Sequence, residues 1–137
     1  MALKTYHGGC HCGAVKYEVD LDLSKGTGKC NCSICTKTRN WSARAEPDPS
    51  GFRLVSSKDS LTDYQFNTHQ GHHVFCKTCG IHSYGYGDIK EAGGAYVAIQ
   101  VACLDDATPE ELLSGPVRYM DGRHDNWWNE PKETRHL

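Results

Sequence analysis

Short stretches in which apolar and polar residues alternate are the clearest pattern in this chain. Val15, Tyr17 and Val19 alternate with charged residues, and this period of two residues predicts a half-buried β-strand. Short apolar runs between turn residues predict further strands at residues 3–7, 41–45, 52–55, 61–66, 81–86, 95–104 and 116–120. We expect residues 52–55 to pair with residues 61–66, and residues 95–104 to form a central strand.

One helix is predicted, at residues 108–113. Thr108 suits the N-cap, Pro109 the first helical position, and Glu111 the third position of a capping box. Gly115-Pro116 then ends the segment. Composition predicts loops at residues 24–29 and 46–51 and an irregular tail over residues 121–137. The chain is therefore expected to be mainly β, with one short helix.

Seven of the eight cysteines fall into three clusters. These clusters are Cys10-His11-Cys12, Cys30-Asn31-Cys32-Ser33-Ile34-Cys35 and Cys76-Lys77-Thr78-Cys79. Thiolates that share a metal ion are typically found at such spacings, whereas a disulfide within Cys-x-Cys would be strained. The clusters therefore favour metal sites over disulfides or redox-active thiols.

The first and third clusters together supply four thiolates. Zinc prefers four tetrahedral ligands, and thiolates are its common partners in structural sites. Glycines flank both clusters, and Gly80 can take the positive φ that such a turn requires. We assign Cys10, Cys12, Cys76 and Cys79 to one structural zinc, which would add stability that a core of this size does not supply.

The second cluster leaves three thiolates, those of Cys30, Cys32 and Cys35. Three protein ligands with an open fourth position are the pattern of a catalytic zinc, and a substrate thiol bound there would be deprotonated. We therefore expect a second, exchangeable zinc and a catalytic role for this triad. Two alternatives stay open: Cys103 or a histidine completes a closed structural site, or Cys103 is a small buried core residue.

Histidines and basic residues lie near the clusters in sequence. One of the histidines would serve as a proton shuttle, the alternative for each being a surface or capping role; they are His69, His72, His73 and His82. The basic residues would offset the charge of the triad or attract an anionic thiol, the alternative being solvated surface charge; they are Lys29, Lys37, Arg39 and Arg44. Trp127-Trp128 either covers a ligand site or packs the tail.

Composition narrows the choice of partners. The formal net charge is −2 and no stretch is a polycation, which argues against nucleic acid as the main partner. No apolar run is long enough to span a membrane, and residues 1–7 lack the apolar core of a signal peptide. The expected location is the reducing cytoplasm, where structural disulfides are rare.

The cysteine clusters, with their flanking glycines, resemble those of the glutathione-dependent formaldehyde-activating (GFA) family. The resemblance rests on Gly8-Gly9-Cys10-His11-Cys12-Gly13, on the cluster at residues 30–35 and on Phe75-Cys76-Lys77-Thr78-Cys79-Gly80, and Cys103-Leu104-Asp105 and Asp121-Gly122-Arg123 extend it. It implies a small zinc-stabilised β-tent of two or more antiparallel sheets. We expect one such domain over residues 1–125, followed by the irregular tail over residues 126–137.

The same resemblance implies two zinc ions per chain, with the second one labile. It implies a carbon–sulfur lyase that joins glutathione, or a similar thiol, to formaldehyde as S-(hydroxymethyl)glutathione. The partners would then be a small-molecule thiol and a small aldehyde. A non-catalytic zinc-binding scaffold or a thiol carrier of the same fold is the alternative.

Overall fold

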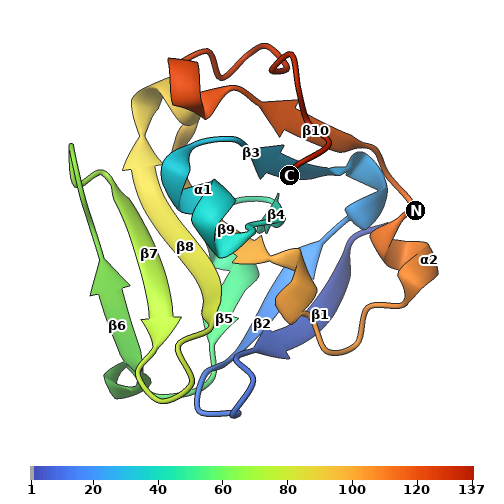
Figure 1. Cartoon of the computed structure of the whole chain (residues 1–137). Helices are drawn as coiled ribbons and strands as arrows, with labels where there is room; N and C mark the ends of the chain where they lie inside the picture. Colours follow the sequence, from blue (N-terminus) through green and yellow to red (C-terminus); the bar gives the residue numbers. More distant parts are fainter. Residues whose placement is uncertain (1) are drawn as a thin grey trace.

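Two β-sheets are the main elements of the computed structural model, which describes residues 2–137 (Figure 1). The smaller sheet has the order β1-β2-β5, and its strands are β1 (Lys4–Gly9), β2 (Lys16–Leu21) and β5 (Phe52–Leu54). The larger sheet has the order β10-β3-β4-β9-β8-β7-β6. Its strands are β3 (Thr27–Cys30), β4 (Ser42–Arg44), β6 (Leu61–Tyr64), β7 (Gly71–Cys76), β8 (His82–Ile89), β9 (Gly94–Gln100) and β10 (Val117–Met120). The prediction of a mainly β fold is confirmed.

One buried cluster joins the two sheets. In β2, Tyr17, Val19 and Leu21 are buried while the residues between them are not, as the period of two predicts. These side chains share a core with residues of the larger sheet, among them Tyr84 and Ile99. The expected central strand at residues 95–104 is shorter than predicted, because β9 ends at Gln100 and a 3-10 turn, Val101–Cys103, follows.

The predicted pairing of residues 52–55 with residues 61–66 is wrong. Strand β5 pairs with β2, where Phe52 lies opposite Val19 and its ring is 5.2 Å from that of Tyr17. Strand β6 instead pairs with β7 at the edge of the larger sheet. Burying Phe52 against the aromatic core outweighs the short connection, which alone would have favoured a hairpin.

The helices also differ from expectation. The predicted helix forms as α2 (Pro109–Leu112), with the Thr108–Glu111 capping box in place. A second α-helix, α1 (Ser33–Thr38), begins directly after Cys32 and was not predicted. The segment at residues 24–29, expected to be a loop, contains most of β3, which pairs in parallel with β10. Neither α-helix of the described residues is long and apolar enough to cross a bilayer.

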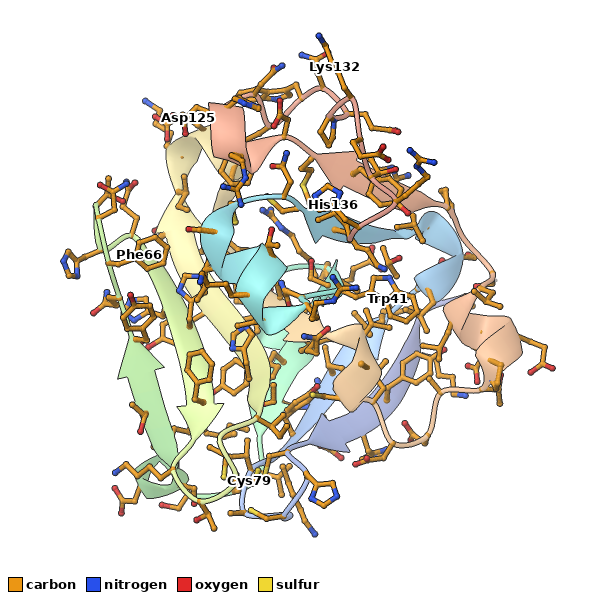
Figure 2. All side chains as sticks on the ribbon, in the orientation of Figure 1. Trp41, Phe66, Cys79, Asp125, Lys132 and His136 are labelled. Carbon is orange, nitrogen blue, oxygen red and sulfur yellow. The ribbon has the colours of Figure 1, made fainter. Side chains whose placement is uncertain are left out.

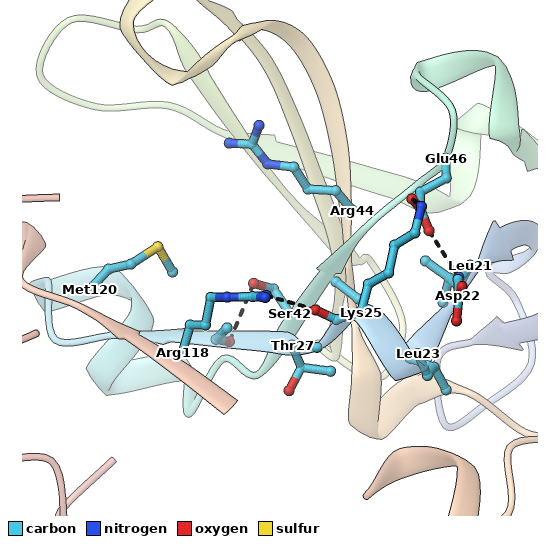
Figure 3. A pocket seen from close by; sticks show the side chains of 13 residues that line it. Leu21, Asp22, Leu23, Lys25, Thr27, Ser42, Arg44, Glu46, Arg118 and Met120 are labelled. Carbon is cyan, nitrogen blue, oxygen red and sulfur yellow. Dashed lines mark hydrogen bonds and ion pairs between the residues drawn. The ribbon is translucent and has the colours of Figure 1, made fainter. Parts of the chain in front are cut away.

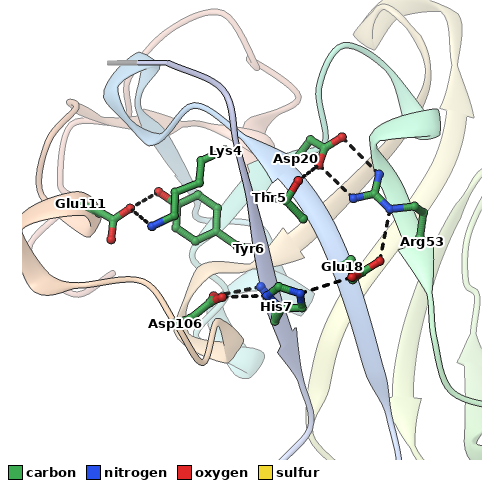
Figure 4. A network of polar contacts seen from close by, with 9 residues as sticks. All are labelled: Lys4, Thr5, Tyr6, His7, Glu18, Asp20, Arg53, Asp106 and Glu111. Carbon is green, nitrogen blue, oxygen red and sulfur yellow. Dashed lines mark hydrogen bonds and ion pairs between the residues drawn. The ribbon is translucent and has the colours of Figure 1, made fainter.

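Polar contacts of β1 connect the smaller sheet to α2 (Figure 4). Tyr6 donates a hydrogen bond to Glu111, and Lys4 lies 2.9 Å from the same carboxylate. These contacts, the Tyr6 hydroxyl first, lower the pKa of Glu111 to about 2. On the neighbouring strand, Arg53 pairs with Asp20 at 2.9 Å. Strand β1 is therefore held at its start by α2 and, as described below, at its end by the first cysteine pair.

Candidate metal centres and the cleft beside them

The first and third cysteine clusters meet at one end of the molecule, where Figure 2 labels Cys79. Cys10 and Cys12 follow β1, while Cys76 ends β7 and Cys79 lies in the turn before β8. The four sulfur atoms lie within 4.8 Å of one another. Sulfur atoms of residues at least 64 positions apart in sequence thus meet here and join strands of both sheets.

Backbone amides surround these sulfurs. The Val15 amide lies 3.2 Å from the Cys10 sulfur, and the amides of Thr78 and Cys79 lie 3.3 and 3.4 Å from that of Cys76. Amide hydrogen bonds from Cys12 and Ile81 lower the pKa of the Cys79 thiol to about 6. Such donors favour the thiolate form, which is the form that binds metal.

The spacing of these sulfurs fits zinc. Four thiolates at the usual zinc–sulfur distance in a tetrahedron are separated by about 3.8 Å. The Cys12 sulfur lies 3.6 Å from the sulfur of Cys10 and 3.6 Å from that of Cys76. The donor set is all thiolate, and four ligands leave no open position. The group therefore has the chemistry of a structural zinc site.

The triad lies at the start of α1. Cys30 ends β3, Cys32 is the N-cap of α1, and Cys35 lies one helical turn further on. An extended spacing followed by a helical one directs the three side chains to the same side, and their sulfurs lie within 4.8 Å of one another. No fourth Cys, His, Asp or Glu of residues 2–137 joins this group at that distance.

Charge in the triad is shared among the three thiols. Hydrogen bonds from the thiols of Cys30 and Cys35 lower the pKa of Cys32 to about 3, and the same contacts, that with Cys30 first, raise the pKa of Cys35. At neutral pH the group thus holds at least one thiolate. Three soft thiolate donors with one vacant coordination position suit zinc in an accessible site.

A cleft of about 520 Å³ opens beside the triad. Cys32, Cys35 and α1 form one wall of the cleft. Phe66, labelled in Figure 2, belongs to the opposite wall. The sheet provides the floor, where register places His73 beside Gly85 and Gly85 beside Ala98. Gly85 and Ala98 add little bulk to this floor, although His73, His82 and Tyr96 also line the cleft, and the volume suits a ligand of drug-like size.

The segment after β10 forms the rim of this cleft. Trp127 lines the cleft, whereas Trp128 is 74 % exposed. A Cβ atom on Gly122 would lie 2.5 Å from the Trp127 ring and 2.6 Å from the Cys30 sulfur, so only glycine fits between them. Trp127 is therefore held beside the triad, and part of the predicted tail is a component of the site.

Asn31 connects this rim to the triad. It is buried, and its side-chain amide donates to the Asp121 carboxylate at 2.8 Å. In return, the backbone amide of Arg123 donates to the Asn31 side chain at 2.9 Å, and Arg123 Nε donates to the Asn31 backbone oxygen at 3.0 Å. Residue 31, between two of the cysteines, thus fixes the position of the rim.

The histidines separate into different environments. His72, His73 and His82 line the cleft, and the ring centroids of His73 and His82 lie 6.0 Å apart. His82 Nδ1 lies 2.9 Å from the Val74 carbonyl oxygen and must donate to it, which leaves Nε2 as an acceptor. Burial lowers the pKa of His82. His72 stacks on Tyr86 and pairs with Asp63 at 2.6 Å, while His69 does not line the cleft.

The basic residues expected around the triad do not line the cleft. Arg39 and Lys29 donate to the backbone oxygens of His136 and Leu137, and Lys37 is exposed. Arg44 lies over the ring of Tyr96, 4.6 Å from its centroid. Among the described residues that line the cleft, Arg123 is the one Lys or Arg. Proximity to the triad in sequence did not predict which basic residues line the cleft, because β4 and the end of α1 direct these side chains away from it.

Cys103 joins neither group of sulfurs. It is partly buried, and its thiol contacts the backbone oxygen of His82 at 3.8 Å. Burial raises the pKa of this thiol to about 11. Cys103 is thus a neutral thiol at physiological pH and makes a useful control for substitutions in the two clusters.

A second cavity, of about 290 Å³, lies between β3, β4 and β10 (Figure 3). Its charged groups are already partnered. Lys25 pairs with Glu46 at 2.8 Å, and Arg118 donates to the Lys25 backbone oxygen at 2.8 Å. It contains no cysteine or histidine among the described residues that line it. The cleft beside the triad is therefore the stronger candidate for chemistry.

Comparisons with known proteins cover the residues of both cysteine groups. A family model described as "Glutathione-dependent formaldehyde-activating enzyme" matches residues 5–117. The crystal structure of a Rhodobacter sphaeroides protein matches with 34 % sequence identity and a TM-score of 0.67, covering 81 % of this chain and 98 % of that one. All seven clustered cysteines lie within the matched residues, whereas Arg123 and Trp127 lie beyond them.

Proposed function

This chain belongs to the glutathione-dependent formaldehyde-activating enzyme family, and from that membership we propose that it is a zinc-dependent carbon–sulfur lyase. The reaction joins glutathione to formaldehyde and gives S-(hydroxymethyl)glutathione, or releases the two in reverse. The observation that carries this proposal is the open group of three thiolates facing a cleft large enough for a tripeptide.

The two groups of cysteines would have separate roles. Cys10, Cys12, Cys76 and Cys79 would hold a structural zinc. Cys30, Cys32 and Cys35 would hold the second zinc, which supplies a position where a substrate thiol is held and its pKa lowered.

The overall step is an addition without oxidation or reduction. The sulfur forms a bond to the carbonyl carbon, the π electrons of the carbonyl group move to its oxygen, and that oxygen takes a proton equivalent to the one the thiol loses. His82 is suited to accept and return this proton, because burial keeps the ring neutral and Nε2 is free to accept.

The walls of the cleft would orient the substrates. Phe66 and Trp127 are apolar surfaces on different sides, and they limit access of water to the sulfur. The floor of the cleft offers little steric resistance to a peptide ligand. Because thiols add to formaldehyde readily without a catalyst, the protein needs to supply only positioning and a proton acceptor.

The test compares Cys32→Ser with Cys103→Ser. Zinc content would be measured after dialysis against a weak chelator, and the rate of S-(hydroxymethyl)glutathione formation by NMR exchange spectroscopy above the uncatalysed rate. We expect Cys32→Ser to lose one zinc and the enzymatic rate while it stays folded, and Cys103→Ser to keep both. A folded Cys32→Ser protein with an unchanged enzymatic rate would contradict the proposed function.

A further inference from the structure

Two opposite charges at the rim of the cleft have no ionic partner among residues 2–137. Arg123 and Asp125 both line the cleft, and neither forms a salt bridge with any described residue. They also do not pair with each other, although only one residue separates them in sequence. Apart from cysteines and histidines, they are the charged residues of the cleft lining that the structure describes.

The positions of both residues are fixed by neighbouring contacts. Arg123 is anchored through its backbone amide and Nε to Asn31. Its two terminal guanidinium nitrogens have no hydrogen-bond partner in the part of the chain that the structure describes. Asp125 has a φ of 52°, and its amide donates to the Gly122 oxygen at 3.2 Å. The turn is closed by the Asn126 amide, which donates to the Asp121 oxygen at 2.9 Å. The backbone of this turn is therefore fixed, and it presents both exposed side chains at the rim of the cleft.

The chemistry of the pair suits a zwitterion. A guanidinium with two free nitrogens matches the two oxygens of a carboxylate, and an aspartate accepts hydrogen bonds from an ammonium group. An α-amino acid head group carries both charges on one carbon. Resting on the proposed function, we propose that Arg123 and Asp125 bind the α-carboxylate and α-ammonium of the γ-glutamyl end of glutathione.

The size of the cleft favours a γ-glutamyl peptide over free cysteine. Pockets of about 300–1,000 Å³ enclose ligands of drug-like size, and this cleft has about 520 Å³. A thiol held at the triad leaves most of that volume for the remainder of the ligand. The positive charge of Arg123 also offsets the negative charge of the three thiolates, which would otherwise repel the α-carboxylate of the ligand.

The experiment measures binding without reaction. S-methylglutathione, whose sulfur is blocked, would be titrated into the zinc-loaded protein by calorimetry. We expect Arg123→Met to weaken binding by about tenfold or more, and Arg123→Lys to restore part of it. Lys37→Met removes the same charge from the exposed side of α1 and is the matched control, expected to bind like wild type. Equal losses in Arg123→Met and Lys37→Met would overturn the proposal, because they would indicate only a general effect of charge.

A second titration isolates the ammonium contact. N-acetylation of S-methylglutathione removes the ammonium charge, so we expect weaker binding to wild type and no further loss in Asp125→Asn. Asp59→Asn is the control for removal of a carboxylate and should respond as wild type does. If acetylation weakens Asp125→Asn as much as wild type, the assignment of Asp125 is wrong.

A titration with S-methylcysteine tests whether the site binds the head group of a γ-glutamyl peptide or that of a free amino acid. Binding as tight as that of S-methylglutathione would overturn the γ-glutamyl assignment. Because no titration involves formaldehyde, failure here is separate from failure of the proposed reaction, which the Cys32→Ser rate tests.

Discussion

The two groups of cysteines are built from the same residue type but differ in how the chain assembles them. The four-cysteine group joins the end of β1 to the turn between β7 and β8, so it depends on the fold of both sheets. The triad comes from six consecutive residues, 30–35, and depends mainly on the start of α1. A cross-link between distant segments stabilises the fold by restricting the unfolded chain, whereas a local group does so far less.

The two groups of cysteines also differ in the atoms that surround their sulfurs. Several backbone amides point at the sulfurs of the four-cysteine group. In the triad, the Cys32 amide lies 3.4 Å from the Cys30 sulfur and the Asn40 side-chain amide 3.9 Å from that of Cys35, and Cys32 and Cys35 also line the cleft. The comparison teaches that the closed group is part of the architecture, while the open group has spare coordination for chemistry.

The largest contrast should appear when one cysteine is removed from each group. Apparent binding free energies of structural zinc are about 10–16 kcal/mol, similar to or above the total stability of an ordinary domain. We therefore expect Cys76→Ser to unfold at room temperature, as measured by circular dichroism and thermal melting. Cys32→Ser should keep its fold, with a melting temperature near that of wild type. Similar melting temperatures for the two variants would refute the division into architectural and chemical groups.

The next largest effect should be on the reaction rate when His82 is replaced. Removing a general base costs about 10²-fold or more in rate, so we expect His82→Gln to be slower by about that factor. Because the pKa of His82 is lowered by burial, the wild-type rate should fall only when the pH drops below the ordinary imidazole value of about 6.5, and the variant should lack this acid limb.

The free energy of unfolding should also decrease at low pH, as the rate does. The unfolded chain takes up a proton at His82 more readily than the folded one, so stability is full above about pH 6.5 and decreases as the pH falls. Urea unfolding at several pH values would show a weaker pH dependence for His82→Gln. His136→Gln is the control, and an identical acid limb in His82→Gln and wild type would exclude this histidine as the base.

A smaller effect should result from Asn31→Ala, and it should be confined to the open group. The variant leaves the Asp121 carboxylate and the Arg123 amide without their buried partner, which costs about 1–3 kcal/mol. Urea unfolding would measure this cost, and competition with a chelator would show weaker metal binding in the triad only. Asn129→Ala, which removes one exposed hydrogen bond, should change neither quantity. Release of metal from both groups in Asn31→Ala would show that they are not independent.

The smallest expected effect concerns the turn of the closed group. Gly80 has a φ of 78°, and a Cβ atom there would have no atom within 4 Å. Gly80→Ala should therefore cost only the conformational penalty, about 1 kcal/mol, with zinc content unchanged. Thermal melting measures it, and a loss of zinc would mean that the turn has less freedom than its open surroundings suggest.

Much of this arrangement could be predicted from local sequence spacing. Cys76 and Cys79 lie across one tight turn, and the capping box of α2 is contained in four residues, so neighbouring residues were sufficient evidence. The pairing of β5 with β2 could not be predicted, because burial of Phe52 in a core formed by distant strands decides it. Arg123 likewise reaches the cleft only through tertiary contacts with Asn31, although the position of Asn31 between two cysteines was a usable signal.

The glycines that line the cleft have a consequence for how ligand length could be adjusted by single substitutions. At Gly85 an added methyl group would meet the His72 backbone oxygen at 2.7 Å, so that position resists change. At Gly71 the nearest atoms would lie 3.7 Å away, an ordinary packing distance. Gly71 is thus the place where an added methyl group can shorten the available space without disturbing the strands, and where related chains can diverge in the bulk of the molecules they admit.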